Sequence, residues 1–147
     1  MGSCMTAGYL LDTNHLGVAV TTNSLLRKRA AELRAGGAKL GTCVPVLCEI
    51  EAGIQQVAQP EAYRTNLQGL LRQIRIWPID RSTARFYGEI HHDLKRRGRV
   101  LSQVDMRIAA LARQMKLTLV SSDRDFAALP DIATENWLAK AGLALKS

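Results

Sequence analysis

The sequence predicts an α/β fold built around a central, mainly parallel sheet of four or five strands. Short apolar runs alternate with longer stretches of helical periodicity, the pattern of strands connected by helical crossovers. The 147 residues are 47% hydrophobic, which is enough for one continuous core. We therefore expect a single domain over residues 1–147, with residues 1–6 as a flexible start.

The strands are predicted from short apolar runs bounded by turn residues. They are Gly8 to Leu11, Lys39 to Val44, Ile74 to Ile79 and Leu117 to Val120, with a short edge strand near Ile132 to Thr134. Because parallel strands end at a common edge of a sheet, polar residues that follow these runs are expected to lie together.

The helices are predicted between these runs. The longer ones run from about Val46 to Val57, Glu61 to Gln73, Ser82 to Arg97 and Gln103 to Met115. An earlier helix, capped by Asn23 or Ser24, should stop at Gly36-Gly37, since glycine suits a helix C-terminus. Two short helices are expected through Leu16 and Val18 and from Phe126 to Leu129.

The composition also indicates the cellular compartment of the protein and the class of partner that it binds. The formal charge of +7 favours a polyanionic partner, because lysine and arginine neutralise phosphates and release counterions. Aromatic residues make up only 5%, too few for base-stacking platforms. No signal peptide or membrane-spanning run is present, and the three cysteines lack a zinc-ligand spacing, so we expect a cytoplasmic protein with reduced thiols.

A dense basic cluster closes the helix that ends near residue 97. Its members are Lys95, Arg96, Arg97 and Arg99. Basic side chains in a last helical turn interact favourably with the helix dipole and are otherwise solvated. The cluster also lies close in sequence to Asp105, which suits steering of phosphates, and its four residues are the candidates for RNA contacts.

Four acidic residues, each at the edge of an apolar segment, are the strongest functional signal. They are Asp12, Glu49, Asp105 and Asp123. Carboxylates gathered at one sheet edge repel one another and protonate unless a divalent cation compensates them. The pattern therefore predicts metal-dependent chemistry.

Each acid also has a structural reading. Asp12 and Asp123 stand where helix caps are common. Ser102 to Asp105 fits a capping-box variant, although helical periodicity places Asp105 within an apolar stripe. Periodicity does not choose between Glu49 and Glu51, but Gly53 lies one turn after Glu49 and leaves open space on that side, which favours Glu49.

His15, three residues after Asp12, has two readings: it could approach a bound phosphate, or it is a satisfied, partly buried histidine, which is favoured. The sequence contains no Gly-rich phosphate loop and no serine or cysteine nucleophile motif. Asp12-Thr13-Asn14 lacks the second acid of an aspartyl-phosphate enzyme.

Four segments in order resemble the acidic motifs of the PIN domain family, in its VapC-like toxin ribonuclease branch. They are Leu10 to Asn14, Glu49 to Gly53, Asp105 to Ala112 and Leu119 to Phe126, followed by a similar tail at Glu135-Asn136-Trp137. The ordered set covers nearly the whole chain. It implies a three-layer α/β/α PIN-like domain and a metal-dependent endoribonuclease, the toxin of a type II toxin–antitoxin pair.

The resemblance implies that Asp12, Glu49, Asp105 and Asp123 hold Mg²⁺ or Mn²⁺. It further implies that Ser121 supports the metal shell through its hydroxyl and that Asn14 orients the pocket or substrate. Asp125 is an outer acid or, as favoured, a helix cap. The implied partners are RNA, a small antitoxin protein and a second copy in a homodimer, without a membrane. The rival hypothesis is a catalytically silent PIN-fold module that binds RNA or a protein partner.

Overall fold

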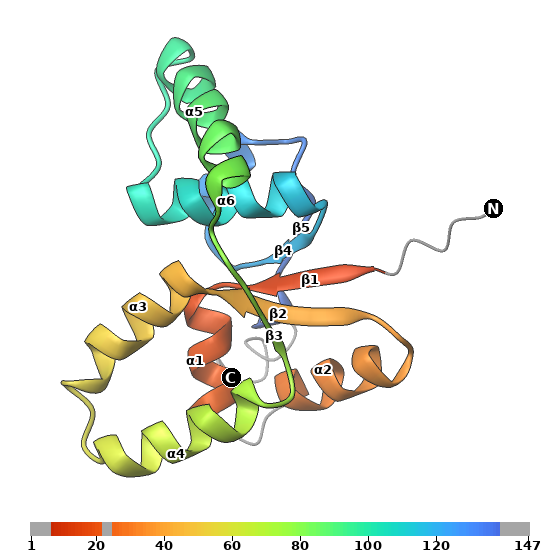
Figure 1. Cartoon of the computed structure of the whole chain (residues 1–147), viewed down its shortest axis with the longest axis vertical. Helices are drawn as coiled ribbons and strands as arrows, with labels where there is room; N and C mark the ends of the chain where they lie inside the picture. The colour runs from red at the N-terminus through yellow and green to blue at the C-terminus, as the bar shows by residue number, and fades with distance from the viewer. Residues whose placement is uncertain (1–6, 22–24, 139–147) are drawn as a thin grey trace, which may run out of the picture.

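Five parallel strands form the sheet at the centre of this computed structural model, which describes residues 7–21 and 25–138 (Figure 1). The strand order is β3-β2-β1-β4-β5, with β1 in the middle. The strands span Gly8–Leu11 (β1), Lys39–Cys43 (β2), Arg75–Trp77 (β3), Thr118–Val120 (β4) and Thr134–Glu135 (β5). The sheet is parallel throughout, rather than mainly so.

Helices lie on both sides of the sheet and complete three layers (Figure 1). The first side carries α1 (Thr13–Thr21), α2 (Leu25–Ala35), α3 (Val44–Ile54) and α4 (Pro60–Leu71). The other side carries α5 (Arg81–Arg96) and α6 (Gln103–Met115). Because helices cover both faces, β1 and β2 are almost wholly buried, as expected of central parallel strands.

Several predicted boundaries shift by a few residues. Val44, expected to end a strand, begins α3, because Pro45 occupies the first turn, where a missing amide hydrogen costs nothing. The third strand is shorter than Ile74 to Ile79, and Ile76 and Ile79 stay 43% and 36% exposed at the sheet margin. The last strand follows Ile132 rather than including it.

Helix ends follow the local chemistry of capping. Asp80 begins α5 with a complete capping box. Its carboxylate accepts from the Thr83 amide at 3.1 Å, and the Thr83 hydroxyl accepts from the Asp80 amide. Gly98, with φ of 67°, ends the same helix in the left-handed conformation that glycine adopts without strain. The predicted stop at Gly36-Gly37 is also observed, but the predicted cap at Asn23 or Ser24 lies outside the described residues.

Gly41 lets β2 and β3 approach each other closely. A Cβ atom at this position would lie 2.5 Å from the Arg75 carbonyl oxygen and 2.7 Å from the Trp77 ring. Backbone cannot shift away cheaply, so a side chain is excluded here. This close contact holds the edge strand against the core.

Two cysteine thiols lie in the described part of the chain, and both are free. Cys43 is buried at the end of β2, and burial raises the pKa of its thiol to about 11. Cys48 is exposed on α3. No helix within residues 7–21 and 25–138 is long and apolar enough to cross a membrane.

Candidate active site

The carboxyl ends of β1 and β4 lie side by side and frame the candidate site. The Asp12 amide, one residue past β1, donates to the Val120 carbonyl at the end of β4 over 3.1 Å. The connections leaving β1 and β4 run toward opposite edges of the sheet. Such a switch in strand order opens a crevice at the sheet edge, where α/β folds bind ligands.

Asp12 is buried, with only 7% of its surface exposed. Its Oδ1 accepts from the His15 amide at 2.9 Å and lies 3.0 Å from His15 Nδ1. Asp12 therefore caps α1 itself, and neither Thr13 nor Asn14 does so. Among the described residues Oδ2 has no hydrogen bond, yet it is not enclosed, so this oxygen is left for a ligand.

Glu49 reaches the site from α3 and is fixed by a residue of α1. The Thr13 hydroxyl donates a hydrogen bond to Glu49 Oε1. Glu51 points elsewhere, because Arg64 of α4 holds both of its oxygens at 2.7 and 3.0 Å. A Cβ atom at Gly53 would meet nothing within 4 Å, so the space beside it is open.

Asp105 lies in the first turn of α6 and is half-buried. Its amide donates to the Ser102 hydroxyl at 3.0 Å, so Ser102 caps α6 as expected, but among the described residues no bond from the Asp105 carboxylate to the Ser102 amide completes a capping box. Burial raises the pKa of its carboxyl, and the negative charges of Asp123, Glu49 and Asp125 raise it further, although a hydrogen bond with Ser102 opposes them. The negative charges of three other acids therefore act on the Asp105 carboxylate.

Asp123 follows β4 and begins the short 3-10 helix Arg124–Ala128. Its Oδ1 accepts from the Asp125 amide at 2.9 Å, and its own amide donates to Ser121 Oγ at 3.0 Å. The cap role expected for Asp125 is therefore wrong, because Asp123 performs it. Ser121 is buried, and its hydroxyl oxygen holds the turn that carries Asp123.

The negative charges of Glu49, Asp123 and Asp125 act on Asp105, and Asp12 precedes Thr13, the residue that binds Glu49. Within the described ranges, no three acidic, histidine or cysteine side chains lie close enough together to enclose an ion. Magnesium is commonly held by one or two carboxylates and keeps its remaining waters, so a full protein cage is not required. Hard oxygen donors that repel one another are the set such a cation fits.

Sequence reasoning missed the role of Thr13, and the role implied for Asn14 stays a prediction. Thr13 is half-buried and directly holds an acid of the site, whereas from sequence alone it is typical of a helix cap. Asn14 is exposed in the first turn of α1, and its side chain has no hydrogen bond within the described residues. The signal that could have identified Thr13 is its position directly after the strand-end acid.

An apolar groove of about 470 Å³ lies beside Glu49. Its walls come from α3, from the segment after β3 and from the first turns of α6. The residues that line it are Val44, Pro45, Cys48, Glu49, Ala52, Pro78, Ile79, Val104 and Arg107. A mostly apolar groove next to acids can accept a partner segment that carries both apolar and basic side chains.

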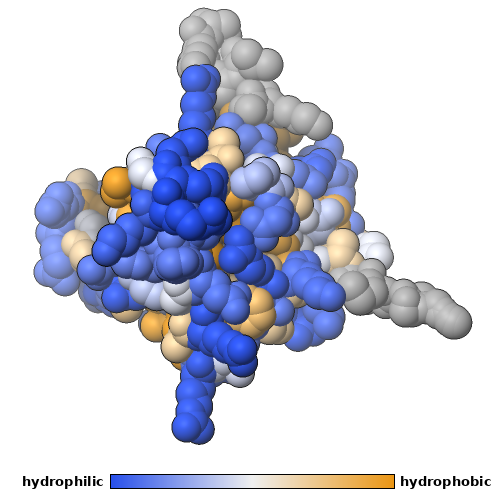
Figure 2. Space-filling view, turned by 90° about the horizontal axis from the view of Figure 1, so that it is seen from above, coloured by the Kyte–Doolittle hydropathy of each residue, from blue (hydrophilic) through white to orange (hydrophobic). Residues whose placement is uncertain are grey.

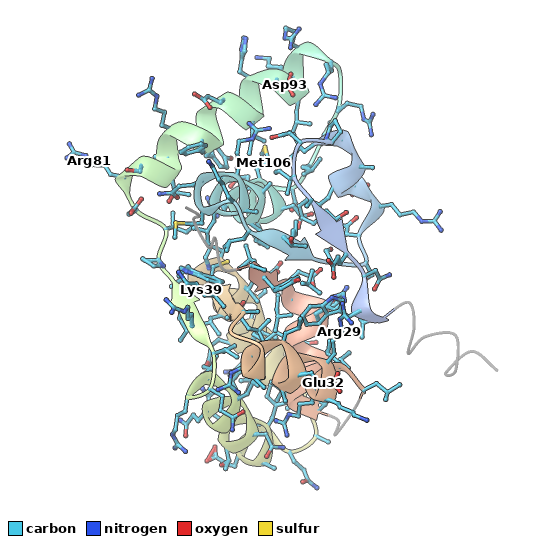
Figure 3. All side chains as sticks on the ribbon, turned by 90° about the vertical axis from the view of Figure 1, so that its right-hand side faces the viewer. Arg29, Glu32, Lys39, Arg81, Asp93 and Met106 are labelled. Carbon is cyan, nitrogen blue, oxygen red and sulfur yellow. The ribbon has the colours of Figure 1, made fainter. Side chains whose placement is uncertain are left out.

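The basic cluster divides into two parts. Asp93 pairs with Arg96 at 2.9 Å and with Arg97 at 2.7 Å, and Arg97 also donates to the Ala128 carbonyl at 2.6 Å. Lys95 and Arg99 instead line a hollow of about 400 Å³ that includes Met106, which lies beneath α5 (Figure 3). The end of the molecule at which α5 lies is mainly hydrophilic (Figure 2).

Comparison with known proteins gives a consistent picture. The sequence matches the PIN domain family over residues 9–132. Ribonuclease VapC2 of Rickettsia felis is 26% identical over 130 residues, which cover 88% of this chain and 97% of that protein. The crystal structure of VapBC2 from Rickettsia felis bound to a DNA fragment from their promoter is also similar, with a TM-score of 0.81 and 25% identity over 88% of this chain and 98% of that one.

A third similar structure is VapBC-5 of Mycobacterium tuberculosis, a member of the VapBC family of toxin-antitoxin systems. Its TM-score is 0.64 at 24% identity, and the match covers 88% of this chain and 97% of that chain. At this identity the likeness concerns the fold alone. The three-layer architecture is thus shared along nearly the full length of each matched chain.

Proposed function

This chain belongs to the PIN domain family, and we propose on this basis that it is a metal-dependent endoribonuclease, the toxin component of a type II toxin–antitoxin system. The observation that carries the proposal is the acidic surroundings of Asp105, whose carboxyl pKa is raised by burial and by three acidic neighbours. A pure binding module gains nothing from carboxylates that face phosphates. Similarity to a VapC ribonuclease supports the choice of reaction.

Asp12, Glu49, Asp105 and Asp123 are the residues proposed to hold Mg²⁺ or Mn²⁺. The bound cation supplies a water of lowered pKa and neutralises charge on the scissile phosphate. The protein positions the carboxylates that would hold this cation. Asp12 presents Oδ2 from the end of β1, Thr13 fixes Glu49, and the turn at Ser121 fixes Asp123.

The polyanionic substrate is supported by charge. Lysine and arginine number 20 against 13 aspartate and glutamate residues, and Lys95 and Arg99 line a hollow at the end of α5. Because few aromatic residues are available to stack on bases, contacts to the RNA backbone are expected to dominate.

The proposed protein partner is a small antitoxin whose segment covers the apolar groove beside Glu49. Similar chains have been crystallised as VapBC assemblies, which supports this choice. A segment with apolar residues toward Ile79 and Val104 and a basic residue toward Glu49 fits the chemistry of the groove. The homodimer implied by the family resemblance stays a prediction, and light scattering on the purified chain tests it.

The activity is tested with purified protein, Mg²⁺ and a mixture of transfer and ribosomal RNA. We expect cleavage that stops when the metal is chelated and returns when Mg²⁺ is restored. Asp12→Asn and Asp105→Asn should each lower the rate at least 100-fold, the scale on which positioned catalytic groups act, and thermal unfolding should show that both variants remain folded.

Glu49→Gln and Glu51→Gln make a matched pair on one helix. The first removes a proposed site acid, whereas the second removes one half of an exposed ion pair with Arg64. Cleavage should fall in the first and stay near wild type in the second. RNA binding that is indifferent to Mg²⁺, with no cleavage over hours, would instead support the silent binding module.

A further inference from the structure

His15 connects Asp12 to the last described segment of the chain. The imidazole is fully buried on α1. Its Nδ1 lies 3.0 Å from Asp12 Oδ1, and its Nε2 lies 3.2 Å from the Trp137 amide nitrogen and 3.3 Å from that of Leu138. One ring therefore spans the gap between a strand-end acid and a segment more than a hundred residues later.

The hydrogen bonds fix the tautomer of this ring. Backbone amides only donate, so Nε2 must accept from Trp137 and Leu138 and carries no proton. The ring proton then resides on Nδ1, which donates to Asp12 Oδ1. With the His15 amide donating to the same oxygen at 2.9 Å, Oδ1 is held twice and Oδ2 is left open.

The segment that hydrogen-bonds to the His15 ring is itself held by several contacts. The Trp137 indole N–H donates to Glu135 Oε1 at 2.9 Å, and its ring lies 5.5 Å from that of Tyr9 in β1. The Arg29 guanidinium from α2 lies 5.1 Å from the centroid of the Trp137 ring, beside the end of the described chain (Figure 3). Because these contacts hold the Trp137 segment in place, the segment can fix the orientation of the His15 ring.

We propose that His15 is a positioning residue that orients the Asp12 carboxylate for a divalent cation, and that residues 135–138 hold His15 in the required tautomer. The inference rests on the proposed metal-dependent function. Hydrogen-bonded partners of metal ligands typically change metal affinity 10- to 100-fold when removed. A role limited to anchoring the C-terminal segment would leave metal affinity unchanged.

Two substitutions separate the roles of the two ring nitrogens of His15. In His15→Asn the amide reaches the place of Nδ1 and keeps a donor toward Asp12, but it loses the acceptor for Trp137. In His15→Gln the amide reaches the place of Nε2 and keeps that acceptor, but it loses the donor toward Asp12. The pair therefore distinguishes positioning from anchoring.

Affinity for Mn²⁺ is measured by electron paramagnetic resonance of the free ion, beside thermal unfolding and cleavage. We expect His15→Gln to bind Mn²⁺ about 10-fold more weakly with a Tm near wild type. His15→Asn should bind within about 3-fold of wild type but unfold at a lower temperature. Equal Mn²⁺ affinity in wild type and His15→Gln would overturn the proposal, as would a larger loss in His15→Asn.

A second measurement reads the tautomer of His15 in the wild-type protein. Long-range ¹H–¹⁵N correlation spectra of wild type report which imidazole nitrogen carries the proton, and the His15 signal is identified by its loss in His15→Gln. We expect a protonated Nδ1 and an unprotonated Nε2, and the opposite tautomer would contradict the proposal. Failure of the proposed function is distinguishable, because then wild type itself neither binds Mn²⁺ nor cleaves RNA.

Discussion

The Thr13 hydroxyl donates a hydrogen bond to the Glu49 carboxylate, which ties the first turn of α1 to α3. The residue directly after the strand-end acid thus orients an acid contributed 37 positions after Asp12 in the chain. Two of the four proposed metal-binding acids therefore depend on one short stretch of backbone.

Thr13→Val removes this hydrogen bond while keeping the shape of the side chain. We expect the cleavage rate to fall about 10-fold, because Glu49 is no longer held in one orientation, in the range seen for partners of metal ligands. Thr13→Ser keeps the hydroxyl and should retain most of the activity. Equal rates for the valine and serine variants would show that the hydrogen bond does not matter, and circular dichroism checks that both fold.

Asp105→Asn should stabilise the protein at neutral pH while it abolishes cleavage. Burial and neighbouring acids raise the Asp105 carboxyl pKa in the folded state, so the ionised form is less favourable there than in the unfolded chain. This destabilisation is absent below the ordinary pKa, grows as the pH rises through the window up to the raised pKa, and is complete above it.

The expected gain for Asp105→Asn, discounted for solvent screening at a half-buried site, is about 2 °C in Tm at pH 7. It should vanish in acid, where both proteins are neutral at this position. Glu51→Gln is the control, since the loss of an exposed ion pair changes stability little. A gain that persists unchanged at acid pH would contradict the electrostatic explanation.

Within the basic cluster, we predict that Lys95 and Arg99 contribute to RNA binding, whereas Arg97 contributes to the stability of the fold. Replacing Lys95 and Arg99 together by glutamine should weaken RNA binding and reduce the slope of log affinity against log salt by about 1 to 2, because up to two phosphate contacts are lost. The unfolding temperature should stay near that of wild type.

Arg97→Gln is the matched control within the same cluster. Its guanidinium joins Asp93 and the Ala128 carbonyl, so we expect a loss of about 1 kcal/mol in unfolding free energy with little change in the salt slope. Fluorescence anisotropy at several salt concentrations, beside chemical unfolding, separates the two effects. The reverse pattern would assign RNA contact to Arg97 instead.

Gly41→Ala should destabilise the fold without any involvement in chemistry. The added Cβ would lie 2.5 Å from the Arg75 carbonyl oxygen, so β2 and β3 must move apart. We expect a loss of about 2 kcal/mol, typical of overpacking in a tight interior. Gly53→Ala, where a Cβ meets nothing within 4 Å, should be neutral or slightly stabilising in α3. Urea unfolding of both variants measures the contrast.

Much of the fold could be predicted because its elements are marked locally. Glycines end α2 and α5, and alternating apolar runs define the strands and their common polarity. The boundary at Val44 was less accessible, because an apolar residue before proline fits either a strand end or a helix start. The structure places Pro45 in the first turn of α3, which makes Val44 a helix start.

The acids of the candidate site were found by their position at strand and helix ends, whereas their partners were not. His15 was favoured as a satisfied histidine, and its burial agrees. Its link to the Trp137 amide joins positions whose proximity exists only in the folded chain. Likewise, no periodicity predicts that Arg64 forms an ion pair with Glu51 or that Thr13 donates a hydrogen bond to Glu49, because both interactions join separate helices.

The central place of β1 also has a consequence for the order in which the protein is made. Tyr9 of β1 pairs with Leu40 on one side and with Thr118 on the other, so one flank of the first strand stays unpaired until Thr118 has been synthesised. Asp105 and Asp123 emerge with that late flank. The four proposed site acids therefore cannot come together until β4 has paired with β1, a contact between residues more than a hundred positions apart.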